Sequence, residues 1–141
     1  MKGFSQINTD YKRRFTQSMK ENEISYEIRG AAFKVYNTLG PGLLESVYEL
    51  ALARELIKMG HQVKTQVGIP VWYDDFKLDI GFRLDLLIDD LVIIEVKSVD
   101  QLIDIHHKQL LSYLKLTNKR LGLLINFNTI DLKSSMIRII N

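Results

Sequence analysis

Residues 84–97 read LDLLIDDLVIIEVK, and this stretch decides the fold. Two apolar runs flank the dipeptide Asp89-Asp90, which is typical of a tight turn between two antiparallel strands. The second run ends in two charged residues, Glu95 and Lys97. Because alternate residues of a strand point to the same side, these two side chains share one face of the sheet. The stretch therefore predicts a buried hairpin that carries polar groups at one end.

A third charged residue, Asp85, interrupts the first apolar run, and the length of the loop decides whether it meets Glu95. A two-residue loop would place Asp85 opposite Ile94 and turn Glu95 to the other side of the sheet. An odd loop, such as 89–91, or a single bulge places Asp85 across from Glu95. We predict the odd register, because two acids on one face can share a cation whereas one acid buried alone is costly.

The apolar spacing on either side of this hairpin predicts a mixed α/β chain. The strand that ends at Val96, the helix after it and the next strand form a crossover unit, so these two strands should be parallel. A Gly-Pro-Gly turn at 40–42 separates the first two helices. The predicted elements are helices at 23–39, 43–59 and 101–116, and strands at 63–72, 78–88, 91–96, 121–127 and 136–140.

The composition restricts the class of protein. A chain of 141 residues, 46% of them hydrophobic, has the length of one ordinary domain with a real core. The sequence has no cysteine, which excludes a disulfide scaffold and a thiolate metal site. No uncharged apolar run approaches the roughly 18 residues that a membrane span needs, and the start does not resemble a secretory signal. We therefore expect a cytoplasmic protein that has no membrane partner.

The net charge of +2 divides unevenly along the chain. Residues 74–104 carry nine acids against three basic groups, whereas residues 105–141 carry six basic groups and one acid. Residues 1–20 carry five basic groups and one acid with little apolar period, so we interpret them as a basic arm, either disordered or a frayed helix. An acidic centre with basic flanks suits a divalent cation beside a phosphate ligand, but it equally suits solvated loops and helices.

Each candidate site residue also has a plainer interpretation. Glu95 could hold a metal while Lys97 orients a water or a phosphate, or the two could form an ion pair where the strand emerges. Gln109 occupies a helical position that should be apolar, with Tyr113 one turn on; its amide could reach the site or bond to backbone in the core. Glu45 could add a carboxylate, or it could be a first-turn acid favoured by the helix dipole.

Three motifs together resemble a known family. The segment GLLESVY at 42–48 resembles the motif of the GxxExxY proteins, a branch of the PD-(D/E)XK nuclease superfamily. Asp85 followed by EVK at 95–97 is similar to the split catalytic signature of that superfamily, and the segment from Gln109 to Tyr113 resembles the QxxxY element of its RecB-like nucleases. The likeness runs from about Ile24 to the C-terminus.

This resemblance implies a restriction-endonuclease-like αβββαβ core of the α/β class, a mixed sheet flanked by helices, in a single domain over residues 21–141. It also implies cleavage of phosphodiester bonds with Mg²⁺ or Mn²⁺. The metal ligands would be Asp85, Glu95, the carbonyl of Val96 and, in addition, Glu45. Lys97 would position or activate the attacking water, and Gln109 and Tyr113 would shape the site.

The expected substrate is DNA, with RNA and a homodimer as further options. The alternative is a non-catalytic module that keeps the nuclease fold and binds nucleic acid or a protein partner. The complete set of acids and the lysine argues against that alternative, because a site that has lost its activity has no reason to keep costly buried charges.

Overall fold

The computed structural model describes residues 3–141, except for the side chain of Ile80. These residues form a mixed sheet flanked by helices. Every predicted helix and strand is present, with boundaries within a few residues except at the N-terminus. The elements are α1 (Phe4–Leu39), α2 (Glu45–Lys58), β1 (Val63–Tyr73), β2 (Phe76–Ile88), β3 (Val92–Lys97), α3 (Asp104–Thr117), β4 (Leu121–Asn126), a 3-10 turn η1 (Lys133–Ser135) and β5 (Met136–Ile140).

The five strands lie in the order β1-β2-β3-β4-β5. Neighbouring strands are antiparallel except β3 and β4, which are parallel and joined through α3. The predicted crossover unit and the α/β fold class are therefore confirmed.

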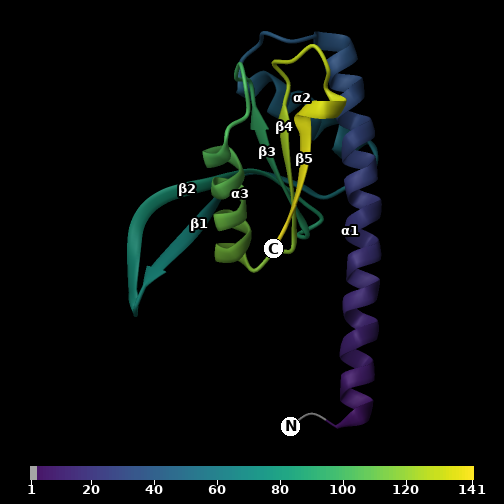
Figure 1. Ribbon diagram of the computed structural model, residues 1–141, viewed down its shortest axis with the longest axis vertical. Helices are drawn as coiled ribbons and strands as arrows, with labels where there is room; N and C mark the ends of the chain where they lie inside the picture. The colour runs from purple at the N-terminus through teal and green to yellow at the C-terminus, as the bar shows by residue number, and fades with distance from the viewer. Residues whose placement is uncertain (1–2) are drawn as a thin grey trace.

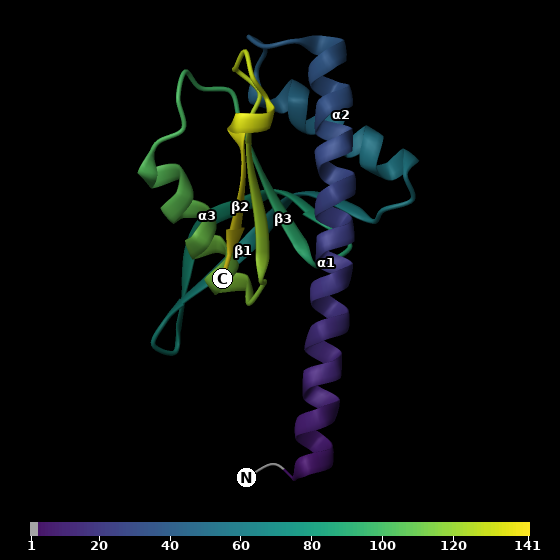
Figure 2. The same cartoon turned by 45° about the vertical axis from the view of Figure 1, so that its right-hand side comes forward.

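The helices cover the two faces of the sheet (Figures 1 and 2). One face packs against α1 and α2 through a core that includes Ile28, Leu52 and Ile94. The other packs against α3, where Leu110 lies so close to β4 that a Cβ added to Gly122 would come within 3.0 Å of it. None of the helices described combines the length and the apolarity needed to cross a bilayer.

The turn between β2 and β3 has the predicted odd register. Leu86 pairs with Ile94 and Ile88 with Val92, so the loop consists of the three residues 89–91. Asp89 and Asp90 both adopt the left-handed conformation, with φ of 51° and 58°. Aspartate tolerates this conformation better than most residues, because its short side chain can bond locally to the backbone. The acidic turn therefore sets the register that the site requires.

The N-terminal segment differs from the prediction. Residues 1 and 2 lie outside the described part of the chain, but from Phe4 onward the segment is regular helix and continues into the helix predicted at 23–39. Of the two alternatives for the arm, disorder is therefore wrong for residues 4–20, and the helix is regular rather than frayed. The large apolar residues before residue 20 do have helical spacing, contrary to the sequence interpretation. They lie on a different face of the helix from the buried residues that follow, which is why the continuity was missed.

His61 joins α1 to the β2–β3 turn. Its Nδ1 lies 2.5 Å from the Oδ2 of Asp89, and its Nε2 contacts the carboxylate of Glu27. Burial lowers the pKa of His61, but the two carboxylates outweigh burial and hold that pKa above its usual value. Burial raises the pKa of Asp89, but His61 and the amide of Gln62 leave that pKa below its usual value. The structure therefore favours a charged His61 between two carboxylates.

We expect His61→Gln to destabilise the protein most near pH 5–6, by about 1–2 kcal/mol. Because the folded pKa of His61 is raised, its contribution is complete below about pH 6.5 and is lost as the pH rises through the folded pKa. Because the folded pKa of Asp89 is lowered, the stability that Asp89 contributes is lost as the pH falls through that pKa. Urea unfolding of both proteins from pH 5 to 9 measures the difference. His107→Gln is the control, and a difference that does not vary with pH would contradict this account.

Candidate active site

The site lies where β2 and β3 part. The last backbone pair of these strands is Leu86 with Ile94. Beyond it two carboxylates accept the amide protons: the amide of Asp85 donates to Glu95 Oε1 at 3.2 Å, and the amide of Val96 donates to Asp85 Oδ2 at 2.9 Å. Figure 1 shows the β1–β2 hairpin curving away from the other strands. The fork therefore brings Asp85 and Glu95 side by side, as the odd register predicts.

Burial makes this pair of acids electrostatically costly. Glu95 is only 4% exposed. Burial, followed by the charge of Asp85, raises the pKa of Glu95 to about 8. Burial also raises the pKa of Asp85, against the opposing effects of the Val96 amide and the Lys97 ammonium. Without a cation the pair therefore keeps a proton at neutral pH, and a bound cation would take the place of that proton.

Side chains from β3 and α3 meet on the same side of the sheet. Lys97 Nζ donates to Gln109 Oε1 at 3.5 Å. Tyr113, one helical turn beyond Gln109, is buried, and its ring centre lies 6.1 Å from that of Phe82. Burial, then the charges of Glu95 and Asp85, raise the pKa of Tyr113. The structure therefore groups Lys97, Gln109 and Tyr113 with the two acids.

Glu45, the first residue of α2, approaches the site from the other face of the sheet. Its Oε1 accepts the amide of Ser98 at 3.2 Å, and Ser98 Oγ donates to the carbonyl of Leu43 at 2.6 Å. The charge of Glu45 contributes to the raised pKa of Asp85. α2 is thus fastened to the end of β3, and Glu45 lies within electrostatic reach of the acid pair.

The sequence profile of the PD-(D/E)XK nuclease superfamily matches residues 22–139. The chain belongs to the PD-(D/E)XK nuclease superfamily. No curated protein and no solved structure matches the chain significantly. Proteins of this superfamily are in general nucleases that use divalent metal ions, so membership indicates a nucleic-acid substrate.

The residues at the PD-(D/E)XK fork fit a hard divalent cation held in an open site. The proposed ligands offer only oxygen, the donor that Mg²⁺ and Mn²⁺ prefer. They are the carboxylates of Asp85 and Glu95 and the backbone carbonyl of Val96. No three Asp, Glu or His side chains among residues 3–141 converge closely enough to enclose an ion. Such a site suits Mg²⁺, which usually keeps several waters and takes few protein ligands. The role of Glu45 as an additional ligand stays a prediction, since its carboxylate bonds to Ser98.

The glycines of the turn at 40–42 and the tyrosine of the GLLESVY segment have a structural role. Gly40 and Gly42 adopt φ of 70° and 96°, which a residue with a side chain rarely accepts. Tyr48 is fully buried and stacks on Phe127 with ring centres 4.6 Å apart. Its hydroxyl donates to the carbonyl of Gly40 at 2.5 Å and accepts the amide of Leu43 at 3.0 Å. Tyr48 therefore fixes the turn that leads into Glu45.

Sequence reasoning missed a fourth carboxylate, Glu49. It is 8% exposed, and Gln66 Nε2 donates to its Oε1 at 2.8 Å. Burial raises the pKa of Glu49, and the charges of Asp85 and Glu45 add to that effect. Gln66 lies in β1 with a left-handed φ of 51°, between the residues that pair with 84 and 86. The available signal was the four-residue spacing from Glu45 to Glu49, which places both acids on one helix face.

Asn126 is a second residue that the sequence did not single out. It is the β4 partner of Lys97 in the sheet and is buried. Its Oδ1 accepts the amide of Val99 at 3.1 Å and its Nδ2 donates to the carbonyl of Val99 at 2.9 Å. Asn126 therefore fixes the chain where it leaves β3, directly after Lys97. An asparagine at the end of an apolar strand was the signal for this role.

Proposed function

We propose that this protein is a metal-dependent nuclease that hydrolyses phosphodiester bonds in DNA. The observation that carries the proposal is the pairing of the buried Glu95 with the half-buried Asp85 where β2 and β3 part, with Lys97 beside them. Membership of the superfamily supplies the reaction class. The DNA preference, the Mg²⁺ or Mn²⁺ requirement and assignment to the GxxExxY branch are parts of the proposal. The cytoplasmic location stays a prediction.

Each proposed role follows from the position of the residue. Asp85, Glu95 and the Val96 carbonyl would hold the cation, with Glu45 as an additional ligand. When bound, the cation would polarise the phosphate and lower the pKa of a bound water. Lys97 would orient the attacking water and stabilise the charge that develops on the phosphate.

The neighbours of Lys97 complete the proposed site. Gln109 would hold the ammonium of Lys97 in place, and Tyr113 would limit the access of bulk water. A hollow of about 500 Å³, lined by the Gly42–Leu44 turn, Val47, Ser98 and Asn128, opens beside Glu45 and offers space for substrate.

Lys97→Ala should reduce the maximal cleavage rate by roughly 10²–10⁴-fold, because an ammonium that acts on the transition state contributes about that much. The affinity for DNA should change far less, since one phosphate contact among several is lost. Single-turnover cleavage and a filter-binding titration separate the two effects. Lys108→Ala, which alters an exposed lysine of the same helix that carries Gln109, is the control. Equal losses in both variants would contradict the role of Lys97.

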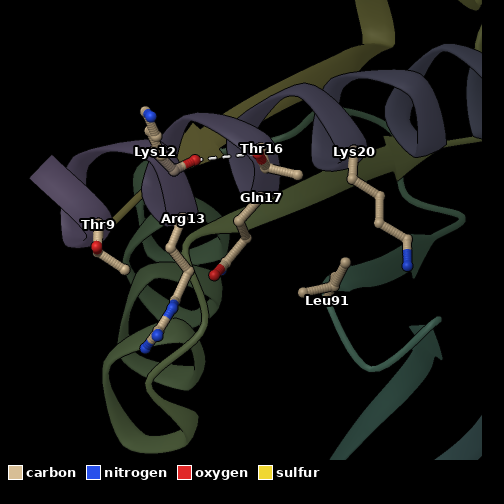
Figure 3. Close-up of a pocket in the computed structure, with 7 residues that line it drawn as sticks. All are labelled: Thr9, Lys12, Arg13, Thr16, Gln17, Lys20 and Leu91. Atoms are coloured by element: carbon tan, nitrogen blue, oxygen red, sulfur yellow. Dashed lines mark hydrogen bonds between the residues drawn. The ribbon is translucent and has the colours of Figure 1, made fainter.

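A groove of about 540 Å³ between α1 and the start of β3 could add phosphate contacts. It is lined by Thr9, Lys12, Arg13, Thr16, Gln17, Lys20 and Leu91, and none of these residues is acidic. Figure 3 shows Arg13 and Lys20 directed to the side of α1 on which Leu91 lies, whereas Lys12 points away. The groove supports the proposal because it gathers positive charge and no acid on one side of α1, which suits a phosphate backbone.

Replacing Arg13 and Lys20 together by Gln should weaken DNA binding uniformly across sequences and reduce the dependence of log K on log salt by about 1–2. The reason is that binding releases about one fewer counterion for each phosphate contact that is lost. Fluorescence anisotropy at several salt concentrations measures the slope. Lys133→Gln, which removes an exposed charge elsewhere, serves for comparison. An unchanged slope in the double variant would exclude the groove from binding.

The proposed activity is tested by incubating purified protein with plasmid DNA, linear DNA and RNA. Mg²⁺, Mn²⁺ and a chelator are the three conditions. We expect DNA cleavage with either metal and none with chelator. Cleavage that persists unchanged in Lys97→Ala would indicate a contaminant. DNA binding without any cleavage would overturn the proposal in favour of a non-catalytic nuclease-fold module.

A further inference from the structure

The first half of α1 carries an exposed apolar stripe. No residue from Phe4 to Lys20 is buried, although this stretch contains five large apolar side chains. Steps of three and four residues place these side chains on one face of the helix. Tyr26, which is 80% exposed, continues the same face. The stripe consists of Phe4, Ile7, Tyr11, Phe15, Met19 and Tyr26, with exposures from 51% to 88%.

The domain to which α1 belongs cannot cover this stripe. At about 100° per residue, Phe15 points roughly 140° around the helix axis from the core residue Ile28. Figures 1 and 2 show this part of α1 extending past the sheet and the other helices. The stretch up to residue 21 also precedes the part of the chain that matches the nuclease superfamily. A contiguous apolar surface of this length usually marks an interaction site.

We propose that this stripe joins two copies of the chain as an antiparallel homodimer. The stripe is nearly symmetric about Phe15: Tyr11 and Met19 lie four residues to either side, and Phe4 and Tyr26 lie eleven residues to either side. In an antiparallel pair with its two-fold axis at Phe15, each of these residues faces an apolar side chain of the second copy. Both chains then use the same surface for the contact, so the assembly stops at two copies.

Charge favours the antiparallel arrangement. Lys12, Arg13 and Arg14 form a basic cluster near the start of α1, and the exposed Glu23 follows further along. A parallel pair would bring the two basic clusters together, which is repulsive. In an antiparallel pair the two basic clusters lie apart. Lys12 of one copy then lies on the same side of the interface as Glu23 of the other copy.

The area is sufficient for a specific dimer. Large aromatic side chains bury about 150–250 Å² each, so six largely exposed residues on each helix could bury on the order of 1,000 Å² over both copies. This is near the lower limit for a specific interface, so we expect a dimer that forms at micromolar concentration. The proposal does not depend on nuclease activity, since all site residues come from one chain.

The absence of cysteine from the sequence allows a direct test. Phe15→Cys should form a disulfide-linked dimer under mild oxidation, because residue 15 meets its own copy at the two-fold axis. Arg13→Cys, about 160° around the helix from residue 15, should remain monomeric on a non-reducing gel. Equal cross-linking at both positions would overturn the proposal, as would no cross-linking at residue 15.

A second measurement needs no cross-link. Sedimentation should give a dimer for the unmodified chain and a monomer for the double variant Tyr11→Glu with Phe15→Glu, while Arg13→Glu with Gln17→Glu stays dimeric. All four positions are exposed, so each variant should keep its circular dichroism spectrum. A monomer for the unmodified chain at about 100 μM would overturn the proposal. A monomeric chain whose affinity for single-stranded oligonucleotides depends on Tyr11 and Phe15 would overturn it too, and would assign the stripe to bases.

Discussion

Glu95→Gln should raise the stability of the metal-free protein while it abolishes metal-dependent cleavage. Glu95 is buried beside Asp85, and its pKa is raised to about 8. At neutral pH the folded protein must therefore take up a proton or tolerate two adjacent charges. A glutamine removes this cost, and its carbonyl can still accept the amide of Asp85. We expect a gain of roughly 2 kcal/mol at pH 7, about 5 °C or more in melting temperature.

The sign of the pH dependence makes this prediction specific. Because the folded pKa of Glu95 lies above its unfolded value of about 4.3, wild-type stability should fall as the pH rises from about 4.3 to 8. The advantage of Glu95→Gln should therefore grow over that range. Melting curves in chelator at pH 5 and pH 8 measure it, with Glu23→Gln as the exposed control. A variant that is less stable than wild type at both pH values would show that the carboxylate stabilises the fold.

Tyr48→Phe should weaken both the fold and the proposed activity. The substitution keeps the ring on Phe127 but leaves the carbonyl of Gly40 and the amide of Leu43 without their partner. Two partly buried polar groups left unpaired cost about 1–3 kcal/mol. Tyr48→Ala, which also removes a fully buried ring, should cost about 3–5 kcal/mol. The loosened turn should misplace Glu45 and slow cleavage by roughly tenfold or more.

Chemical denaturation of Tyr48→Phe and Tyr48→Ala measures these losses, and cleavage well below the melting temperature separates the effect on activity from unfolding. Tyr26→Phe, which alters an exposed tyrosine, should change neither quantity. If Tyr48→Phe matched wild type in both, the hydroxyl would have no part in holding the turn.

The strand pattern and the grouping of the candidate site residues could be predicted from the sequence because both depend on local rules. Alternation of apolar residues located the strands, and loop parity placed Asp85 opposite Glu95. The register was nevertheless a choice between two loops, and the chemical cost of a lone buried acid decided it correctly. Gln109 was recognisable because it occupies a position where the helix pattern calls for an apolar residue.

Other features depend on contacts between distant segments, which a single sequence does not contain. Glu49 became part of the site through Gln66, whose left-handed backbone lies in a strand that otherwise looks regular. Asn126 acts through the backbone of Val99, a contact set by the parallel pairing of β3 and β4. The continuity of α1 was hidden because its apolar face before residue 20 points away from the core and does not continue the core-facing pattern.

The central claim is that Asp85 and Glu95 together hold a divalent cation. Thermal unfolding in rising concentrations of Mn²⁺ tests it directly, because an ion that binds only the folded state raises the melting temperature by mass action. The account predicts a rise for the wild-type protein that continues with the logarithm of Mn²⁺ concentration, and little or no rise for Asp85→Asn or Glu95→Gln. An equal rise in all three proteins would place any bound cation elsewhere and contradict the claim.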